Sequence, residues 1–197
     1  DEAVYGLPEL FRDKIRKADI IANPGCYPTS AILGLAPMVQ HPGYFEFDII
    51  VDAKSGATGA GIKPKAVTLF SNVNENFFAY GIKTHRHTIE IEQILTKVAA
   101  RDVQTQFTPH LLPVDRGILS TIYLKPKQNI EENDLKDIFL KFYKDHPFVR
   151  VRTALPAIKD VRGTNFCDIY PSYDPRTNRV IIIAVIDNLM RGASGQA

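Results

Sequence analysis

Apolar side chains recur at every second position in several stretches of the chain, which is the period of a strand with one buried face. Residues 45–51 show this pattern first, with Phe45, Phe47, Ile49 and Val51 in one register. A mainly apolar run at residues 18–22 predicts a further buried strand. The same reasoning predicts strands over residues 104–114, 118–125, 148–154, 164–170 and 179–186.

Other stretches repeat their apolar positions with the 3.6-residue period of a helix. Residues 91–98 and 135–142 both carry apolar side chains at i, i+3, i+4 and i+7. Further helices are expected over residues 9–17, from residue 28 onward and over residues 187–197. A turn at residues 173–178 joins the last two predicted strands into a hairpin. Hairpins with interspersed helices predict an α+β fold, a mostly antiparallel mixed sheet with helices packed on one face. Residues 64–80 give no clear pattern.

Composition narrows the class of protein. The 197 residues are 45% hydrophobic and carry a formal net charge of +2, enough apolar content for one domain with a real core. Lys and Arg are scattered rather than clustered, which disfavours a nucleic acid partner. No apolar run approaches the roughly 18 residues of a membrane helix, so no membrane partner is expected. Two cysteines far apart give no disulfide framework and favour a reducing cytosol.

One of the two cysteines lies in a sharp turn between a predicted strand and a predicted helix. The turn reads Asn23-Pro24-Gly25-Cys26-Tyr27-Pro28. A thiol at the start of a helix lies near unpaired N–H groups, which favour the thiolate and therefore a nucleophile. The alternative is a small buried apolar residue, the usual role of a free cysteine. Cys167 falls on a predicted alternating strand and is assigned to structure.

A glycine-rich loop follows the strand at residues 45–51. Gly56 and Gly61 have the separation of a P-loop, but Ile62 stands where the phosphate-binding lysine is required. The order Gly-x-x-Gly-x-Gly also differs from the dinucleotide fingerprint. Two interpretations remain. One is a flexible hairpin loop. The other is an anion-binding loop whose backbone N–H groups meet an oxyanion beside Lys63.

Two histidines precede the predicted helix at residues 91–98. His85 and His87 flank Arg86, and Thr88 is a plausible N-cap, so both rings are expected in the loop or first turn. A zinc site would need further ligands, and the other histidines offer no supporting spacing, so no metal is expected. A cysteine and a histidine at two helix starts suggest a thiol nucleophile with an acid/base partner. Accidental exposure of both histidines is the alternative.

Six motifs, taken together and in this order, resemble the N-acetyl-gamma-glutamyl-phosphate reductases, NADPH-dependent enzymes of arginine biosynthesis. The resemblance spans nearly the whole chain, and Lys63 stands near the place where this family often has an arginine. The motifs are Asn23-Pro24-Gly25-Cys26-Tyr27-Pro28-Thr29, Ser55-Gly56-x-x-Gly59-Ala60-Gly61, His85-Arg86-His87-x-x-Glu90-Ile91, Phe107-Thr108-Pro109-His110-Leu111-x-Pro113-x-x-Arg116-Gly117, Gly163-Thr164-Asn165 and Ile186-Asp187-Asn188-Leu189-x-x-Gly192-Ala193-x-Gly195-Gln196-Ala197.

The resemblance implies a fold like the catalytic domain of glyceraldehyde-3-phosphate dehydrogenase and a reaction through a cysteine thioester. It makes Cys26 the nucleophile that attacks the acyl phosphate of N-acetyl-glutamyl 5-phosphate, and His85 the acid/base group. The product is the 5-semialdehyde plus phosphate. Asn188 becomes a candidate contact for the nicotinamide amide. The substrate-binding candidates are Ser55, Gly56, Arg86, His87 and Arg116.

The resemblance also implies a division of the chain. Residues 1–23 are expected to be the tail end of a nucleotide-binding domain, and residues 24–186 a catalytic and dimerisation domain. Residues 187–197 are expected to start a helix that returns to the nucleotide-binding domain. NADPH is then bound mainly by the absent N-terminal domain. A cytoplasmic homodimer or homotetramer that acts on a small acyl phosphate is the expected assembly.

Two rival functions remain open. One is another acyl-phosphate-reducing enzyme such as an aspartate-semialdehyde dehydrogenase, against which the motif at Arg116-Gly117 and the terminal motif from Asp187 argue. The other is a cysteine hydrolase, in which Cys26 and His85 form a dyad and no nucleotide is needed. Dependence of turnover on NADPH separates the reductases from the hydrolase.

Overall fold

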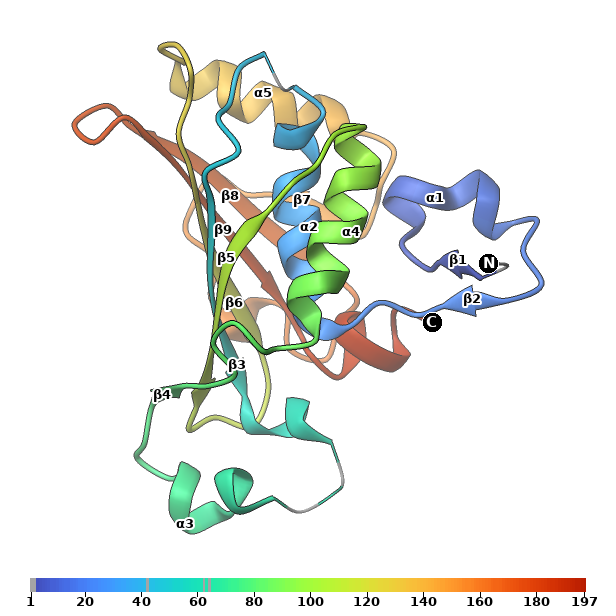
Figure 1. The fold of residues 1–197 in the computed structure, drawn as a ribbon, viewed down its shortest axis with the longest axis vertical. Coiled ribbons are helices and arrows are strands. Elements are labelled where there is room, and N and C mark those ends of the chain that lie inside the picture. Colours follow the sequence, from blue (N-terminus) through green and yellow to red (C-terminus); the bar gives the residue numbers. More distant parts are fainter. Residues whose placement is uncertain (1–2, 42, 62, 64) are drawn as a thin grey trace.

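The computed structural model describes residues 3–41, 43–61, 63 and 65–197. Its body is a seven-stranded mixed sheet of order β4-β5-β3-β6-β9-β8-β7 (Figure 1). The β3–β5 and β7–β8 pairs are parallel, and the other four pairs are antiparallel, which confirms the mostly antiparallel α+β fold. The strands are β3 (Ile49–Gly56), β4 (Phe78–Ala79), β5 (Thr105–Leu112), β6 (Ile118–Leu124), β7 (Val149–Val151), β8 (Cys167–Asp174) and β9 (Arg179–Ile186).

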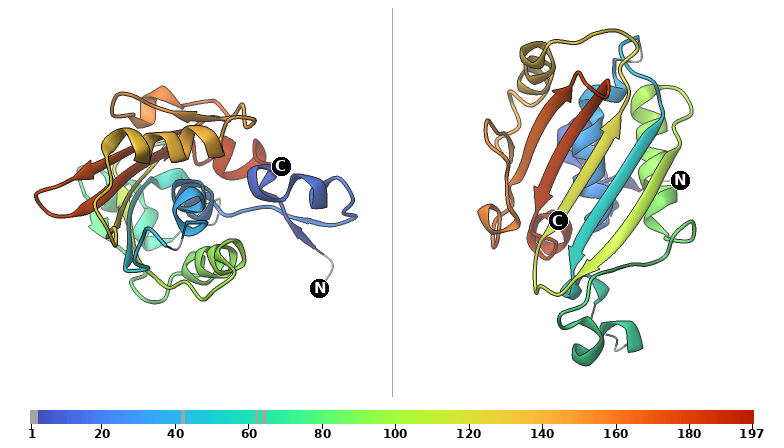
Figure 2. Two further views of the ribbon diagram at one scale, coloured as in Figure 1. Left: turned by 90° about the horizontal axis from the view of Figure 1, so that it is seen from above. Right: turned by 90° about the vertical axis from the view of Figure 1, so that its left-hand side faces the viewer.

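Three helices pack on one face of this sheet, as Figure 2 shows, and this too confirms the expectation. They are α2 (Cys26–Val39), α4 (His87–Ala99) and α5 (Glu132–Phe142). Every residue of α2 after Cys26 is buried, because α2 contacts β6 and β9 on one side and α4 and α5 on others. In the part of the chain that the structure describes, no helix has the length and apolarity needed to cross a membrane.

The alternating pattern of the sequence separates the two faces of the sheet. Along β6 the side chains are alternately buried and half-buried, with Ile122 in the core beneath α2. The opposite face carries no helix (Figure 2) and has half-buried apolar side chains across its central strands. These are Ile50, Leu119, Tyr123, Ile181 and Ile183. The sheet therefore has one face covered by helices and one open face, on which these apolar side chains lie among polar ones such as Asp52, Lys54 and Thr121.

Several element boundaries differ from those predicted. The strand predicted at residues 45–51 begins at Ile49 and runs into the predicted loop as far as Gly56. Phe45 is fully buried but forms only an isolated bridge with Pro126. The hairpin of β8 and β9 is confirmed. The segment that showed no pattern forms a separate lobe with η2 (Ala66–Thr68), α3 (Phe70–Val73) and the edge strand β4 (Figure 1).

The two ends of the chain lie together at one side of the body (Figure 1). There β1 (Val4–Tyr5) pairs in parallel with β2 (Ile21–Ala22), and α1 (Pro8–Ile15) lies between them in sequence. The strand predicted at residues 18–22 is wrong in extent and burial. Only its last two residues pair, and both are exposed, because β1 is their only strand partner among the described residues.

The C-terminal segment forms a π-helical turn, η4 (Met190–Ser194), rather than a regular helix. The guanidinium of Arg191 pairs with the carboxylate of Glu9 at 2.5 Å, and both side chains are 4% exposed. The side-chain amide of Gln196 donates to the carbonyl oxygen of Gly6 at 2.7 Å. These contacts join the C-terminal segment to residues 6–9.

Candidate functional site

Cys26 is the first residue of α2, two residues earlier than the predicted helix start. Gly25 is its extended N-cap, with φ −67° and ψ 159°. The backbone N–H and the hydroxyl of Thr29 both donate to the carbonyl oxygen of Gly25, at 3.0 and 2.9 Å. The first turn of α2 is therefore closed around Gly25, and Cys26 projects from a fixed backbone.

The environment of the Cys26 thiol differs from the one that the sequence predicted. Burial raises the pKa of Cys26 above its ordinary value, since a thiolate loses hydration there. Backbone N–H groups of Tyr27 and Cys26 lower this pKa, the carboxylate of Glu90 raises it, and the guanidinium of Arg86 lowers it. The predicted preference for thiolate is therefore wrong in net sign, because desolvation outweighs the groups at the helix start.

The two histidines lie at the start of α4. His87 is the first helical residue and Arg86 the N-cap, so the prediction of Thr88 as N-cap is wrong. The backbone N–H of His87 donates to Nδ1 of His85 at 3.2 Å. A neutral imidazole that accepts at Nδ1 carries its proton on Nε2. His85 therefore offers an N–H donor at Nε2.

Aromatic rings surround the imidazole of His85. The ring centroids of Tyr27, Tyr80, His87 and Phe107 lie 4.8 to 5.7 Å from it, all in edge-on arrangements. Burial and then the charge of Arg86 lower the pKa of His85. For His87, burial followed by the charges of His85 and Arg86 lowers the pKa to about 3. Both rings are consequently neutral near pH 7.

Cys26 and both histidines open onto one cavity of about 540 Å³, between the body of the domain and the lobe. The end of β3, the glycine-rich loop and residues of the lobe complete its wall. The hydroxyl of Ser55 is buried there and donates to the carbonyl oxygen of Gly56 at 3.0 Å. The sequence-predicted residues that this cavity brings together are Cys26, Ser55, Gly56, His85, Arg86 and His87.

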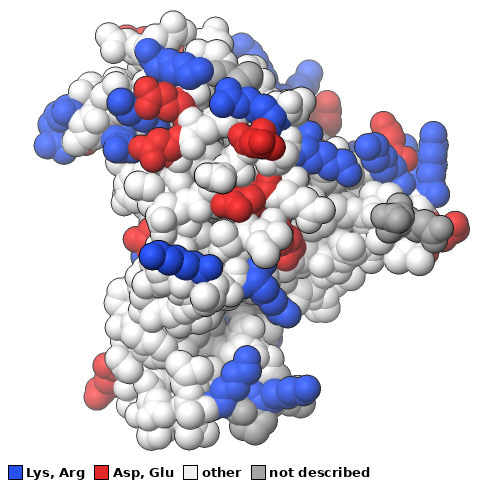
Figure 3. Space-filling model, in the orientation of Figure 1, with Lys and Arg blue, Asp and Glu red and all other residues white. Residues whose placement is uncertain are grey.

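The cavity wall is electropositive. Lys63, Lys65 and Arg86 line it, and no aspartate or glutamate does so among the described residues. No described residue forms an ion pair with any of the three cations. In Figure 3, positive side chains lie on both sides of the hollow above the lower lobe. Such a wall favours a ligand with more than one negative charge.

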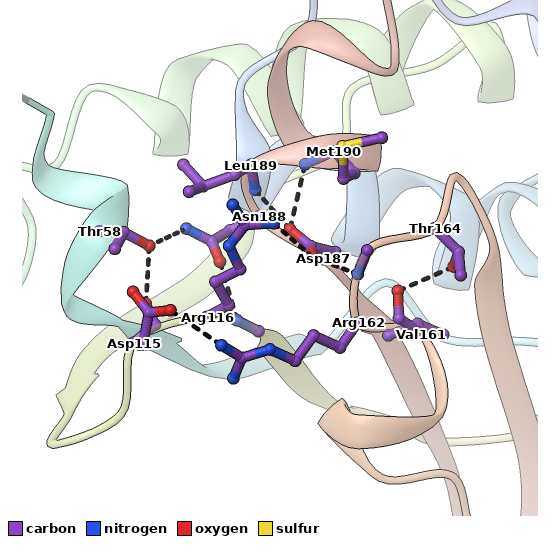
Figure 4. Close-up of polar contacts among 12 residues, drawn as sticks. Thr58, Asp115, Arg116, Val161, Arg162, Thr164, Asp187, Asn188, Leu189 and Met190 are labelled. Carbon is purple, nitrogen blue, oxygen red and sulfur yellow. Dashed lines mark hydrogen bonds and ion pairs between the residues drawn. The ribbon is translucent and has the colours of Figure 1, made fainter.

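Arg116 and Asn188, two further predicted site residues, lie outside the wall of this cavity. Figure 4 shows them in a polar network behind the glycine-rich loop. The guanidinium of Arg116 lies 3.4 Å from the buried carboxylate of Asp187. Burial acts to raise the pKa of Asp187, but N–H groups of Gly163, Leu189 and Met190, with Arg116, outweigh it and lower the pKa.

Each end of the Asn188 amide has a partner within the chain. Its oxygen accepts from the backbone N–H of Gly117 at 2.8 Å, and its nitrogen donates to the hydroxyl of Thr58 at 3.0 Å (Figure 4). The side chain is 2% exposed. One N–H of the amide has no partner among the described residues, but burial of the side chain keeps it from providing a ready nucleotide contact. Its present effect is to tie the glycine-rich loop to the turn between β5 and β6.

Sequence reasoning missed three residues of this region. Tyr80 lines the cavity and donates to the hydroxyl of Tyr27 at 3.2 Å. Lys65 adds a second lysine beside Lys63, a signal present in the sequence as Lys-x-Lys. Glu90 stands three residues after His87 and accepts from the backbone N–H of Gly25 at 2.8 Å. No group of three or more potential metal ligands occurs among the described residues.

The fold is that of a semialdehyde dehydrogenase domain. The family model described as "Semialdehyde dehydrogenase, dimerisation domain" matches residues 26–188, and the chain belongs to this family. The solved aspartate semialdehyde dehydrogenase II from Vibrio cholerae shares the fold, with a TM-score of 0.74 at 15% identity. It matches over 99% of this chain and 66% of its own chain.

Curated relatives are much more similar in sequence, and they confirm the resemblance recognised from the motifs. The N-acetyl-gamma-glutamyl-phosphate reductase of Pelotomaculum thermopropionicum is 54% identical over 197 residues, 99% of this chain and 57% of the relative. The enzyme of the same name from Symbiobacterium thermophilum is 55% identical over 201 residues, 100% of this chain and 58% of the relative. The chain thus spans somewhat more than half of these relatives.

Proposed function

We propose that this chain is the catalytic half of an N-acetyl-gamma-glutamyl-phosphate reductase. The observation that carries the proposal is the cavity that the Cys26 thiol and the His85 imidazole line together with three cations, none of which forms an ion pair with a described residue. The substrate named by the family has a phosphate and a carboxylate on one short chain, which suits that charge. The enzyme would belong to arginine biosynthesis and act as an oxidoreductase.

The first step uses only this chain. The sulfur of Cys26 attacks the acyl carbon, the carbon–oxygen bond to phosphate breaks, and phosphate leaves with its electron pair to give a thioester. Burial raises the pKa of the thiol and Arg86 lowers it, so the thiol would lose its proton to solvent before the attack, and Arg86 would favour the resulting thiolate. Lys63, Lys65 and Arg86 would receive the phosphate and the carboxylate. Ser55 and Gly56, which line the same cavity, would contact the acyl chain.

His85 would act on the acyl oxygen rather than on the thiol. Its neutral ring presents N–H at Nε2, the form that donates to an oxygen as negative charge develops. NADPH, when bound, supplies the hydride that converts the thioester carbon to the aldehyde level. Release of the aldehyde then breaks the carbon–sulfur bond and returns the thiolate of Cys26. His87, buried with Nδ1 unpartnered, would orient the substrate.

The rest of the enzyme would supply the nucleotide site. Residues 1–23 would be the tail of a nucleotide-binding domain, since β1 and β2 form a small, exposed parallel pair beside the body. Residues 24–186 would be the catalytic and dimerisation domain. Residues 187–197 would return the chain toward the first domain, in line with the contacts of Arg191 and Gln196 with residues 6–9. Arg116 would hold Asp187 at the start of this segment. Asn188 would meet the nicotinamide through its second N–H, once a shift of the chain exposed the side chain.

A second copy of the chain would pair through the open face of the sheet to give a homodimer or homotetramer. That face carries no helix and has apolar side chains on its central strands beside the ion pair of Asp52 and Lys54. The matching family model is described as a dimerisation domain, which supports self-association. The compartment would be the cytoplasm, where free thiols stay reduced.

Acylation and reduction can be tested separately in the full-length protein. The protein is mixed with N-acetyl-glutamyl phosphate without NADPH, and intact-mass spectrometry is expected to show an acyl adduct that Cys26→Ser lacks. Addition of NADPH is expected to discharge the adduct as aldehyde. Discharge as the free acid without NADPH would instead indicate a cysteine hydrolase. Faster acylation by aspartyl phosphate would favour an aspartate-semialdehyde dehydrogenase.

A further inference from the structure

The carboxylate of Glu90 joins three parts of the chain that are distant in sequence. Its Oε1 accepts the backbone N–H of Gly25 at 2.8 Å and the hydroxyl of Tyr5 at 2.8 Å. Glu90 lies in the first turn of α4, three residues after His87, while Tyr5 belongs to β1. One oxygen therefore connects the nucleophile turn, the histidine helix and the N-terminal strand.

The position of Cys26 depends on how Gly25 is held. The N–H of Gly25 precedes α2 and takes no part in the helix, so Glu90 is its only hydrogen-bond partner among the described residues. The carbonyl side of Gly25 is fixed by Thr29. On the third side, a Cβ added to Gly25 would lie 2.6 Å from Nε2 of His87, so the ring of His87 rests against this glycine. Both contacts that reach Gly25 from outside its own helix come from one turn of α4.

We propose that Glu90 is a positioning residue that sets the Cys26 turn against the histidine-bearing end of α4, and that Tyr5 holds its carboxylate in place. The inference rests on the proposed function only in taking Cys26 as the nucleophile. A nucleophile displaced by about 1 Å loses roughly a hundredfold in rate. Tyr5 would also transmit the position of the N-terminal strands to the thiol, because it donates to the same oxygen.

The charge of Glu90 gives this role a measurable signature. A carboxylate this close opposes ionisation of the Cys26 thiol and of the Tyr5 hydroxyl, and it contributes to the raised pKa of each after burial. Glutamine in its place keeps the accepting oxygen and removes the charge. Alanine removes both. The two substitutions therefore separate the geometric contribution of Glu90 from its electrostatic one.

Glu92 provides a matched control on the same helix. Its Oε1 also accepts one backbone N–H, that of Thr105, at 2.8 Å, but it has no contact with the nucleophile turn. Glu90→Gln, Glu90→Ala, Tyr5→Phe and Glu92→Gln would be made in the full-length protein. Each would be measured for kcat, KM, thermal unfolding and the pH dependence of Cys26 alkylation by iodoacetamide.

We expect Glu90→Ala to lower kcat about 10- to 100-fold with KM nearly unchanged, and Glu90→Gln to restore most of the loss. Tyr5→Phe should show a smaller fall in kcat. Both Glu90 variants should shift the midpoint of Cys26 alkylation to lower pH, whereas Glu92→Gln should not. A normal kcat in Glu90→Ala, or equal loss in both Glu90 variants with an unmoved midpoint, would overturn the proposal. Alkylation needs no substrate, so it tests Glu90 even if the wild-type protein reduces no acyl phosphate.

Discussion

At the scale of single residues, burial sets the protonation states of the site more strongly than charge does. The thiol of Cys26 is kept protonated by loss of hydration, and His85 and His87 are kept neutral for the same reason. A neutral thiol beside a neutral imidazole is less reactive than an ion pair. Of the three cations in the cavity wall, Arg86 lowers the pKa of the Cys26 thiol and so partly opposes the effect of burial.

The two cysteines should differ in their reaction with an alkylating reagent. Cys26 is partly exposed and lines the cavity, whereas Cys167 is fully buried and burial raises its pKa to about 12. We expect iodoacetamide to modify Cys26 much faster than Cys167 in the native protein. The rate at Cys26 should still rise above pH 9, because its pKa is raised as well. Peptide mapping of the native and unfolded protein measures both rates. Equal rates at the two thiols before unfolding would contradict this.

The two histidines should differ in their effect on turnover. In the full-length enzyme, His85→Asn should lower kcat by roughly 100- to 10,000-fold, the range for loss of general acid/base catalysis, and His87→Asn by less. Since the pKa of His85 is lowered, the ring stays neutral as the pH falls through 6.5. Wild-type kcat should therefore hold down to a pH below 6.5. Steady-state assays across pH measure both effects, and a larger loss in His87→Asn would move the role to His87.

At the scale of elements, the periodic pattern predicted most of the strands and helices but not the residues at which the helices begin. The spacing at residues 135–142 predicted α5 because its apolar face meets the sheet. The start of α4 at His87 escaped prediction, since no side chain caps it, and a residue with helical φ and ψ, Arg86, precedes it. The start of α2 at Cys26 was missed for a similar reason, because the extended cap is a glycine without a side-chain acceptor.

The residues of the candidate site were likewise only partly predictable from the sequence. The motifs around Cys26, Ser55 and His85 supplied six residues that the fold brings to one cavity. Arg116 carries a suitable charge for an anion but pairs with Asp187. The two residues are distant in sequence and meet because β6 pairs with β9. Lys65 was missed because its segment has no periodic pattern. Local sequence thus indicates chemistry, while the choice between ligand and internal partner depends on tertiary contacts.

The junction between α2 and α4 should not tolerate a methyl group at Gly25. A Cβ there would lie 2.6 Å from the ring of His87, whereas a Cβ on Gly43 would meet no atom within 4 Å among the described residues. We expect Gly25→Ala to displace the His87 ring, lower kcat at least tenfold and lower the melting temperature by several degrees, as a clash of about 1–3 kcal/mol would. Gly43→Ala serves as the control and should change neither. Activity assays and calorimetry on both variants provide the test. An unchanged kcat and melting temperature in Gly25→Ala would show that the His87 ring can move aside without loss of activity or stability.

The same junction should make stability depend on pH. The pKa of His87 is about 3 in the fold, against an ordinary value of 6.5, so below pH 6.5 the unfolded chain binds a proton that the folded chain does not. Stability from this residue should be intact above pH 6.5 and fall by about 1.4 kcal/mol per unit as the pH drops toward 3. The difference in urea unfolding between wild type and His87→Asn isolates the effect, because carboxylates contribute to both. A difference that stays constant from pH 7 to pH 5 would rule it out.

At the scale of the whole molecule, the candidate site lies apart from the region where the two ends of the chain meet. The cavity, thiol and cations lie within residues 26–111, while the only residue proposed to meet the nicotinamide, Asn188, has both ends of its amide engaged. The parallel pair β1 and β2 and the contacts between the two ends of the chain stand to one side of the body (Figure 1). That side is where a nucleotide-binding domain would attach.

The last prediction is that the 197-residue chain by itself associates through its open sheet face but binds NADPH very weakly. A surface of apolar side chains on central strands costs free energy in water until a second copy covers it, at about 25 cal/mol per Å² of buried area. No glycine-rich loop of this chain presents the pyrophosphate site of a dinucleotide fold. Calorimetry with NADPH and sedimentation velocity would measure the two properties in one preparation.

A charge introduced by substitution at the centre of that face distinguishes specific pairing from non-specific hydrophobic association. Leu119 lies half-buried on the open side of β6, paired in register with Lys54 and Val185, whereas Leu155 is 71% exposed in a loop away from the sheet. Leu119→Lys should yield a folded monomer, because a buried ammonium opposite a second copy lacks hydration. Leu155→Lys should leave the assembly unchanged. A strictly monomeric wild-type chain that binds NADPH at micromolar concentration would overturn both halves of the prediction, and dissociation by Leu155→Lys alone would move the interface to another surface.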